Sequence, residues 1–179
     1  MSWEKDLEEL KKRAELAKEM GGIERIAKHY ARGRLTVRER IDQFLDEDSF
    51  HETGEITGKV SYDESGEIKE FIPANFVFGR GKVDGREVVI AGDDFTVRGG
   101  AADARIGNKS LYSLKLAEHL RLPLVNLVDG SGGGGSVKTL ETMGATYVPG
   151  LPSWQNIVRL LSMVPVVGAC MGSVAGLGS

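Results

Sequence analysis

The apolar residues at the start of the chain recur at steps of three and four, with charged residues between them. These positions are Trp3, Leu7, Leu10, Ala14 and Ala17. This spacing predicts an amphipathic helix over residues 3–20, which Gly21-Gly22 ends, and a second short helix over residues 23–31. Because the apolar stripe needs a partner surface outside any sheet, we expect these helices to have a role in assembly.

A third helix is predicted by a capping-box pattern, in which Thr36 and Glu39 can each bond the other's backbone N–H group. We expect this helix to run to about Leu45. Its inward-facing residues are predicted to be Val37, Ile41 and Phe44. Residues 1–45 are therefore predicted to form a helical N-terminal arm, and residues 46–179 a separate domain.

After the arm, the apolar spacing becomes that of β-strands. Phe50–Val60 predicts a strand or an irregular ribbon, and Ser61–Glu70 predicts an exposed hairpin tip. Ala74–Val83 and Arg86–Ala91 predict two paired strands. They are joined by Asp84-Gly85, a dipeptide that favours a two-residue hairpin turn with positive φ angles.

The second half of the chain repeats a unit of strand, glycine-rich turn and helix, which predicts an α/β fold with a mainly parallel core sheet. Buried strands are expected at Leu124–Val128 and Pro165–Cys170. Helices are expected at Ala104–His119, after Pro152 and, together with a loop that covers the site, within Val137–Gly150.

The last residues predict the start of another buried helix, formed by the small residues 171–178. A helix that stops there lacks the continuation that would bury its apolar face, so we expect a piece of a larger domain. Cys170, just before it, is expected to be a small core residue rather than a nucleophile, because free cysteine is usually buried.

Composition and charge exclude several classes of protein. The chain has 179 residues, of which 41% are hydrophobic and 27% charged, as in ordinary globular proteins. A net charge of −3 argues against generic nucleic-acid binding. The charged start argues against a secretory signal, and no stretch is apolar enough to span a membrane. A single cysteine favours a cytoplasmic protein, and the three scattered histidines predict no metal site.

The strand Leu124–Val128 ends at Asp129 and runs into a glycine-rich turn, Gly130–Gly135. Consecutive glycines cost backbone entropy, so such a run needs a reason. Without a Cβ atom, a ligand carbonyl can lie directly on the backbone N–H groups. Because ligands bind at the carboxyl ends of strands in open α/β sheets, the position favours a binding site. A flexible linker is the alternative.

Several separated motifs, in the right order, resemble the carboxyltransferase subunits of biotin-dependent acyl-CoA carboxylases. These include propionyl-CoA and methylcrotonyl-CoA carboxylases and related decarboxylases. Gly79–Ala104 is similar to a segment of this family, Gly33–Ile41 resembles its G-K-L-T-A-R-E-R-I segment, and Gly168–Ser173 resembles its G-P-C-x-G-G turn. The resemblance covers the first half or so of the family's N-terminal domain. It implies a partial crotonase or ClpP-like ββα spiral, preceded by the helical arm.

The resemblance also implies a chemistry, in which a carboxyl group moves from carboxybiotin to the α carbon of a short acyl-CoA. That carbon loses a proton, and backbone N–H groups hold the resulting enolate oxygen. The family's D-S-G-G-A-R turn aligns on Asp129–Gly135, here with one residue inserted and Gly-Gly in place of Ala-Arg. Gly132 and Gly133 fit the donor positions best. Acyl-CoA is then the substrate, biotin is carried on a partner protein, and no metal is expected.

Coenzyme A is expected to bind along Phe95–Ala101, with Arg98 facing phosphate and the backbone of Gly99, Gly100 and Ala101 beside the ligand. Further candidates for binding the coenzyme are Arg34, Arg38, Lys109, Gly172 and Ser173. The arginines of residues 32–40 have an alternative interpretation as a solvated helix face.

In the family, the biotin pocket lies on the C-terminal domain of a neighbouring subunit. The resemblance therefore implies a homo-oligomer with biotin carboxylase and biotin carboxyl carrier partners, and no carboxyl transfer by this chain alone.

Three other functions are alternatives. A crotonase-type hydratase or isomerase would need an acid near the turn, such as Asp129 or Glu141. A serine peptidase would use Ser131, which lacks a G-x-S-x-G motif. The third is a non-catalytic assembly module.

Overall fold

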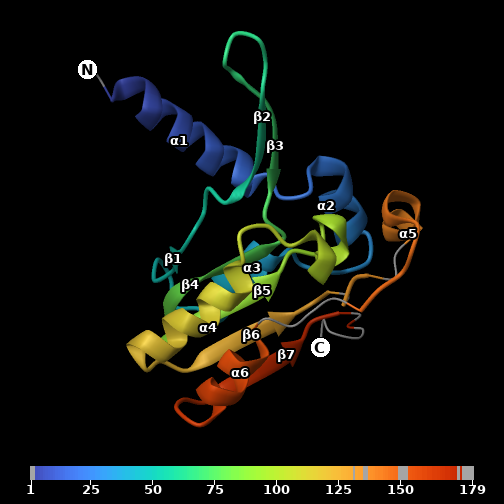
Figure 1. Cartoon of the computed structure of the whole chain (residues 1–179). Helices are drawn as coiled ribbons and strands as arrows, with labels where there is room; N and C mark the ends of the chain where they lie inside the picture. The colour runs from blue at the N-terminus through green and yellow to red at the C-terminus, as the bar shows by residue number, and fades with distance from the viewer. Residues whose placement is uncertain (1–2, 131, 135–136, 149–152, 173, 175–179) are drawn as a thin grey trace.

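The computed structural model describes residues 3–130, 132–134, 137–148, 153–172 and 174. Short 3-10 turns occupy Arg98–Gly100 and Ala102–Ala104. The helices and strands, in chain order, are α1 Glu4–Lys18, α2 Ile23–Tyr30, α3 Val37–Phe44, β1 His51–Glu52, β2 Gly58–Tyr62, β3 Ile68–Pro73, β4 Phe76–Val83, β5 Arg86–Asp93, α4 Lys109–Leu120, β6 Leu124–Val128, α5 Val137–Met143, α6 Trp154–Leu161 and β7 Val166–Cys170 (Figure 1).

A five-stranded sheet with the order β1-β4-β5-β6-β7 forms the centre of the molecule. β4 pairs antiparallel with β1 and β5, whereas β5, β6 and β7 are parallel. The prediction of a mainly parallel sheet is therefore wrong in detail, since the sheet is mixed. The cause is local: Asp84 and Gly85 have φ angles of 49° and 77°, so the predicted two-residue turn reverses the chain between β4 and β5.

Helices cover the two faces of this sheet, with α4 and α6 on one face and α3 on the other (Figure 1). The two faces can be read from β5. Val89 and Ala91 pack with buried residues of α4 and α6, whereas Val88 and Ile90 pack with those of α3. This alternation is the two-residue period of a strand that is buried on both sides. Because β5, β6 and β7 are parallel, their carboxyl ends lie at one shared edge of the sheet.

The first helix, α1, lies outside this core and packs beside the β2–β3 hairpin, which projects away from the sheet (Figure 1). The Tyr62 hydroxyl of the hairpin donates to Glu9 of α1 at 2.7 Å. The first part of the apolar stripe predicted for α1 is exposed, with Trp3 at 71%, Leu7 at 54% and Leu10 at 44% of full exposure, whereas Ala17 at its end is buried. None of the described helices has the length and apolar character needed to cross a membrane.

The capping box of α3 is confirmed, because Glu39 N–H donates to Thr36 Oγ1 at 3.3 Å and Thr36 N–H donates to Glu39 at 2.8 Å. Val37 and Ile41 face the core as predicted. Phe44 does not: it is 42% exposed, and Leu45 is buried in its place. Phe44 is the last residue of α3, and Leu45 after it already has an extended backbone, so helical spacing does not determine which of these two side chains reaches the core.

Three predicted boundaries are also corrected. Phe50–Val60 is not one strand, because β1 covers only His51–Glu52 and β2 begins at Gly58. The hairpin loop is shorter than Ser61–Glu70, since its two ends belong to β2 and β3. The helix expected from Ala104 begins at Lys109, after the 3-10 turns. Each difference lies at an element boundary, where apolar spacing carries little information.

The strand β7 differs from the prediction of a buried strand, because it has only β6 as a partner among the described residues. Cys170 at its end is exposed, so the prediction of a core cysteine is wrong. Most of the residues expected to begin the next helix lie outside the described residues. The same holds for three single residues named above, Ser131, Pro152 and Ser173.

Candidate functional site

The turns at the carboxyl ends of the three parallel strands come together at three glycines, of which Gly100 and Gly130 contact each other and Gly172 contacts Asp129. Gly100 follows β5, and a Cβ atom on it would lie 2.7 Å from the carbonyl oxygen of Asp129. A Cβ atom on Gly130, after β6, would lie 2.6 Å from the carbonyl oxygen of Gly100. A Cβ atom on Gly172, after β7, would collide with the Asp129 carboxylate. The three segments can approach this closely only because glycines stand at the contacts.

The glycine-rich turn continues from this junction. Gly133 and Gly134 have φ angles of 75° and 74°, a region that side-chain-bearing residues seldom adopt. Gly132 and Gly134 are buried, and Gly133 is partly exposed. The Tyr147 N–H donates to the Gly134 carbonyl at 2.9 Å, so the loop after α5 returns to the turn. Gly133 is thus the glycine of this group that is open to a ligand.

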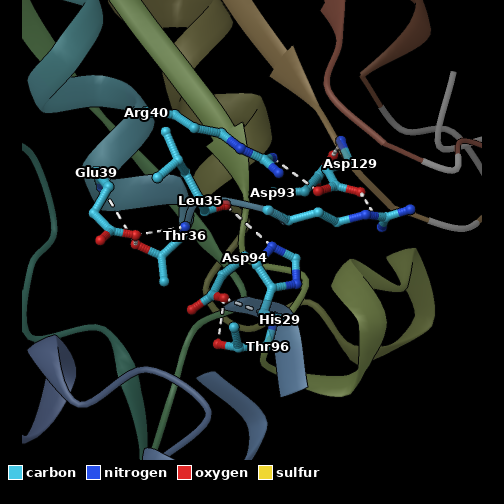
Figure 2. A network of polar contacts seen from close by, with 10 residues as sticks. His29, Leu35, Thr36, Glu39, Arg40, Asp93, Asp94, Thr96 and Asp129 are labelled. Carbon is cyan, nitrogen blue, oxygen red and sulfur yellow. Dashed lines mark hydrogen bonds and ion pairs between the residues drawn. The ribbon is translucent and has the colours of Figure 1, made fainter. Parts of the chain in front are cut away.

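A buried ion pair anchors the start of the turn (Figure 2). Arg40 of α3 donates to Asp129 Oδ2 at 2.8 Å, with the two side chains 5% and 0% exposed. Arg34 lies farther away, with its Nη1 atom 3.9 Å from Asp129 Oδ1. The negative charge of Asp129 is therefore compensated by Arg40, which lies 89 residues earlier in the sequence. Because Asp129 is held in this ion pair, it is disfavoured as the acid of a hydratase or isomerase.

A second carboxylate, Asp93, lies beside the same junction and was not identified from the sequence. The Asp129 N–H donates to Asp93 Oδ2 at 3.4 Å, and Arg105 approaches the other oxygen to 3.3 Å. Burial raises the pKa of Asp93 above its ordinary value, although Arg105 opposes this effect. The available signal was an acid at the carboxyl end of a buried strand, in the run Gly92-Asp93-Asp94.

Asp94 and Thr96 fix the turn that follows β5 (Figure 2). Asp94 accepts hydrogen bonds from the backbone N–H and the hydroxyl of Thr96, at 2.9 and 2.5 Å. Burial raises the pKa of Asp94, while the bonds from Thr96 oppose the shift. The Gly21 N–H in turn donates to Thr96 Oγ1 at 2.9 Å. The turn is therefore held against the start of α2.

A cleft of about 360 Å³ opens between α2 and this turn. It is lined by Arg25, Lys28, His29, Arg32, Phe95, Thr96, Arg98 and Gly99. The cations of this cleft are exposed, and no ion pair joins any of them to another described residue. His29 is buried at its base and stacks on Phe95, with ring centroids 5.7 Å apart. Uncompensated positive charge on two walls suits a polyanionic ligand.

The structure separates the cationic residues that the sequence grouped as phosphate ligands. Arg98 lines the cleft. Arg38 and Lys109 instead both contact Glu52, at 2.7 and 3.3 Å. Burial lowers the pKa of Lys109, and Glu52 opposes that shift. Glu52 thus already pairs with both of these cations, away from the cleft, and the Arg34 guanidinium lies 3.9 Å from Asp129.

Two cations of the cleft, Arg25 and Lys28, were not predicted from the sequence, which offered Arg32 only as one of the arginines of residues 32–40. Arg25, Lys28 and Arg32 are spaced by three and four residues, which places them on one side of α2 and its C-terminal end. That spacing was a usable signal. It could not show that this side would face the turn after β5, because the turn is more than sixty residues away in sequence.

Comparison with known proteins identifies relatives along nearly the whole chain. The family described as "Carboxyl transferase domain" matches residues 28–179. The chain is 30% identical over 178 residues to the propionyl-CoA carboxylase carboxyltransferase subunit of Haloferax mediterranei, covering 98% of this chain and 33% of that protein. It is 32% identical over 173 residues to the methylmalonyl-CoA decarboxylase subunit alpha of Propionigenium modestum, covering 96% and 32%.

Solved structures show the same similarity in three dimensions. A transcarboxylase 12S structure, described as a hexamer with methylmalonyl-coenzyme A bound, matches with a TM-score of 0.70 at 27% identity. The match covers 98% of this chain and 33% of that chain. A single-chain, multi-domain long-chain acyl-CoA carboxylase matches with a TM-score of 0.69 at 25% identity, covering 97% and 18%. The chain therefore spans about a third of the length of the curated relatives it matches.

Proposed function

We propose, from the premise that this chain belongs to the carboxyl transferase domain family, that it forms the acyl-CoA half of a carboxyltransferase site. The reaction would move a carboxyl group from carboxybiotin to the α carbon of a short acyl-CoA. The observation that carries the proposal is the junction of the turns after β5, β6 and β7, where Gly100 and Gly130 are in contact and Gly172 lies against the Asp129 carboxylate.

The role proposed for the glycine-rich turn is to stabilise an enolate. When the α carbon loses its proton, negative charge develops on the thioester oxygen, and the backbone N–H groups of Gly132 and Gly133 would hold it. Loss of one such donor costs about 2.7–4 kcal/mol in a hydrolase. The enolate carbon would then bond the carboxyl carbon of carboxybiotin as its N–C bond breaks, and the biotin nitrogen, which keeps the electron pair of that bond, would take up the proton lost by the α carbon. Gly99, Gly100 and Ala101 would lie beside the thioester end of the coenzyme.

The proposed partners follow from the same family relationship. Biotin would arrive on a biotin carboxyl carrier protein after carboxylation by a biotin carboxylase subunit. We also propose a homo-oligomer, which the exposed part of the α1 stripe supports because its three largest apolar side chains are 44–71% exposed. The transcarboxylase 12S structure is itself described as a hexamer assembly.

The enolate role can be tested with acetoacetyl-CoA, because the enolate form of this compound absorbs in the near ultraviolet. We expect the chain to increase the enolate fraction at fixed pH. Gly133→Val should abolish this increase, because a side chain would block the oxygen from the amides. Gly168→Val is the matched control, since Gly168 lies in β7 with open space where a Cβ would be. Binding of the ligand without a rise in enolate absorbance would contradict the proposal.

A further inference from the structure

We infer that α2 recognises the 3′-phosphate of coenzyme A, so that the N-terminal arm supplies a wall of the substrate site. The inference rests on the proposed function and goes beyond it, because the sequence assigns the helix over residues 23–31 only to assembly. Its basis is the cleft between α2 and the turn after β5.

The charges of the cleft match the charges of the ligand. Coenzyme A carries a diphosphate and a separate phosphate monoester, which alone bears about 1.5–2 negative charges at neutral pH. Arg25, Lys28 and Arg32 line one wall and Arg98 the other, and the cleft contains no acidic residue. Arginine and lysine bind phosphate through charge-assisted hydrogen bonds, and Arg can do so with two bonds at once.

The cleft is large enough for only one end of the coenzyme. Pockets that enclose a whole drug-sized ligand measure roughly 300–1,000 Å³, so a cleft of about 360 Å³ lies near the lower limit. Coenzyme A is a long molecule whose thioester would lie at the glycine-rich turn. The nucleotide end would then occupy the cleft, with the flexible pantetheine arm between the two places.

The path between the two places follows a single turn of the chain. Arg98 precedes Gly100 by two residues, and Gly100 contacts Gly130 at the start of the glycine-rich turn. Arg98 therefore stands on the side of the cleft nearer the thioester. The diphosphate, which joins directly to pantetheine, would meet Arg98. The 3′-phosphate projects from the ribose at the outer end, where the cations of α2 lie.

The two walls are held in place before any ligand binds. Gly21 N–H donates to Thr96 Oγ1 at 2.9 Å, which ties the start of α2 to the turn. His29 of α2 stacks on Phe95, and the Arg34 guanidinium lies 5.8 Å from the centroid of the same ring. Because these contacts fix the spacing of the walls, little ordering would be needed on binding, which favours affinity.

The test is isothermal titration calorimetry of the whole chain with coenzyme A, dephospho-coenzyme A and ATP. The unmodified chain should bind coenzyme A about tenfold or more tightly than either of the other two, because they lack a 3′-phosphate. The double variant R25A/R32A should lose this preference. R98A should weaken coenzyme A and dephospho-coenzyme A by a similar factor, because it would contact the phosphates that both share.

The control is K5A/K11A, which removes the same number of positive charges from exposed positions on α1 and should keep the preference. Equal affinity for coenzyme A and dephospho-coenzyme A, or an unchanged preference in R25A/R32A, would overturn the inference alone. ATP binding as tight as that of coenzyme A would show a generic polyphosphate site and would also overturn it. Failure to bind any coenzyme A would overturn the proposed function as well.

Discussion

The pair formed by Arg40 and Asp129 is the residue-scale feature on which the glycine-rich turn depends. Both side chains are almost completely buried, and the pair joins α3 to the residue that opens the turn. A buried pair adds little net stability compared with apolar residues, because both charges lose their hydration. Removing one partner is different, since the remaining charge stays buried without compensation.

We therefore expect Arg40→Gln to lower the free energy of unfolding by roughly 3–5 kcal/mol. Arg34→Gln is the matched control, because Arg34 is 3.9 Å from the same carboxylate and is more exposed, so its loss should cost much less. Urea unfolding followed by circular dichroism measures both values. Adding Asp129→Asn to Arg40→Gln should recover part of the loss. Equal losses in the two single variants would show that Asp129 does not depend on Arg40.

At the scale of the element, the N-terminal helices have different surroundings. α3 packs on the sheet, and α2 is tied to the turn after β5. α1 contacts the projecting β2–β3 hairpin and leaves its apolar stripe exposed. An amphipathic helix is stabilised mainly by burial of its apolar side, so α1 is the element of the arm that most needs a partner.

We expect a second copy of the chain to cover this stripe. The double variant L7Q/L10Q should then lower the mass measured by light scattering, because each leucine that is no longer buried loses about 1.5–3 kcal/mol. K5Q/K11Q changes exposed residues of the same helix that lie outside the stripe and should leave the mass unchanged. An unchanged mass in L7Q/L10Q would contradict a role for α1 in assembly.

At the scale of the whole molecule, the proposed function would place on the described fold one side of a reaction that needs two substrates. Much of the advantage of such a catalyst comes from holding both reactants in register. The chain spans about a third of the length of its curated relatives. The family resemblance implies that the biotin pocket would lie in a later domain of a neighbouring subunit. The acyl-CoA side and the biotin side would then be separable.

We expect the 179-residue chain to show no transfer from carboxybiotin to propionyl-CoA, measured as formation of the carboxylated thioester. A protein in which a relative's remaining two thirds follow this chain should show transfer. Gly132→Val or Gly133→Val in that longer protein should remove most of it. Transfer by the 179-residue chain alone would place the biotin site elsewhere. Full activity of both valine variants would mean that the glycine-rich turn is a linker.

The sequence by itself determined the features that depend on neighbouring residues. Thr36 and Glu39 cap α3 across one helical turn, and Asp84-Gly85 closes a hairpin because adjacent positive φ angles suit these residues. The apolar run of Leu124–Val128, interrupted only by Asn126, indicated a strand buried on both faces, and β6 is that strand. The fold was predicted from the family's motifs, because they occur in this chain in the same order as in the family.

Only the tertiary structure decided which distant residues meet. Arg40 and Asp129 are 89 positions apart, and no local spacing could pair them. The cations of α2 face the turn after β5 because Gly21 and Thr96 are in contact, a result of how the arm packs on the sheet. The same reason separates Arg38 and Lys109 from Arg98: apolar burial fixes the sheet and its helices first, and each charged side chain then pairs with whatever that packing brings near.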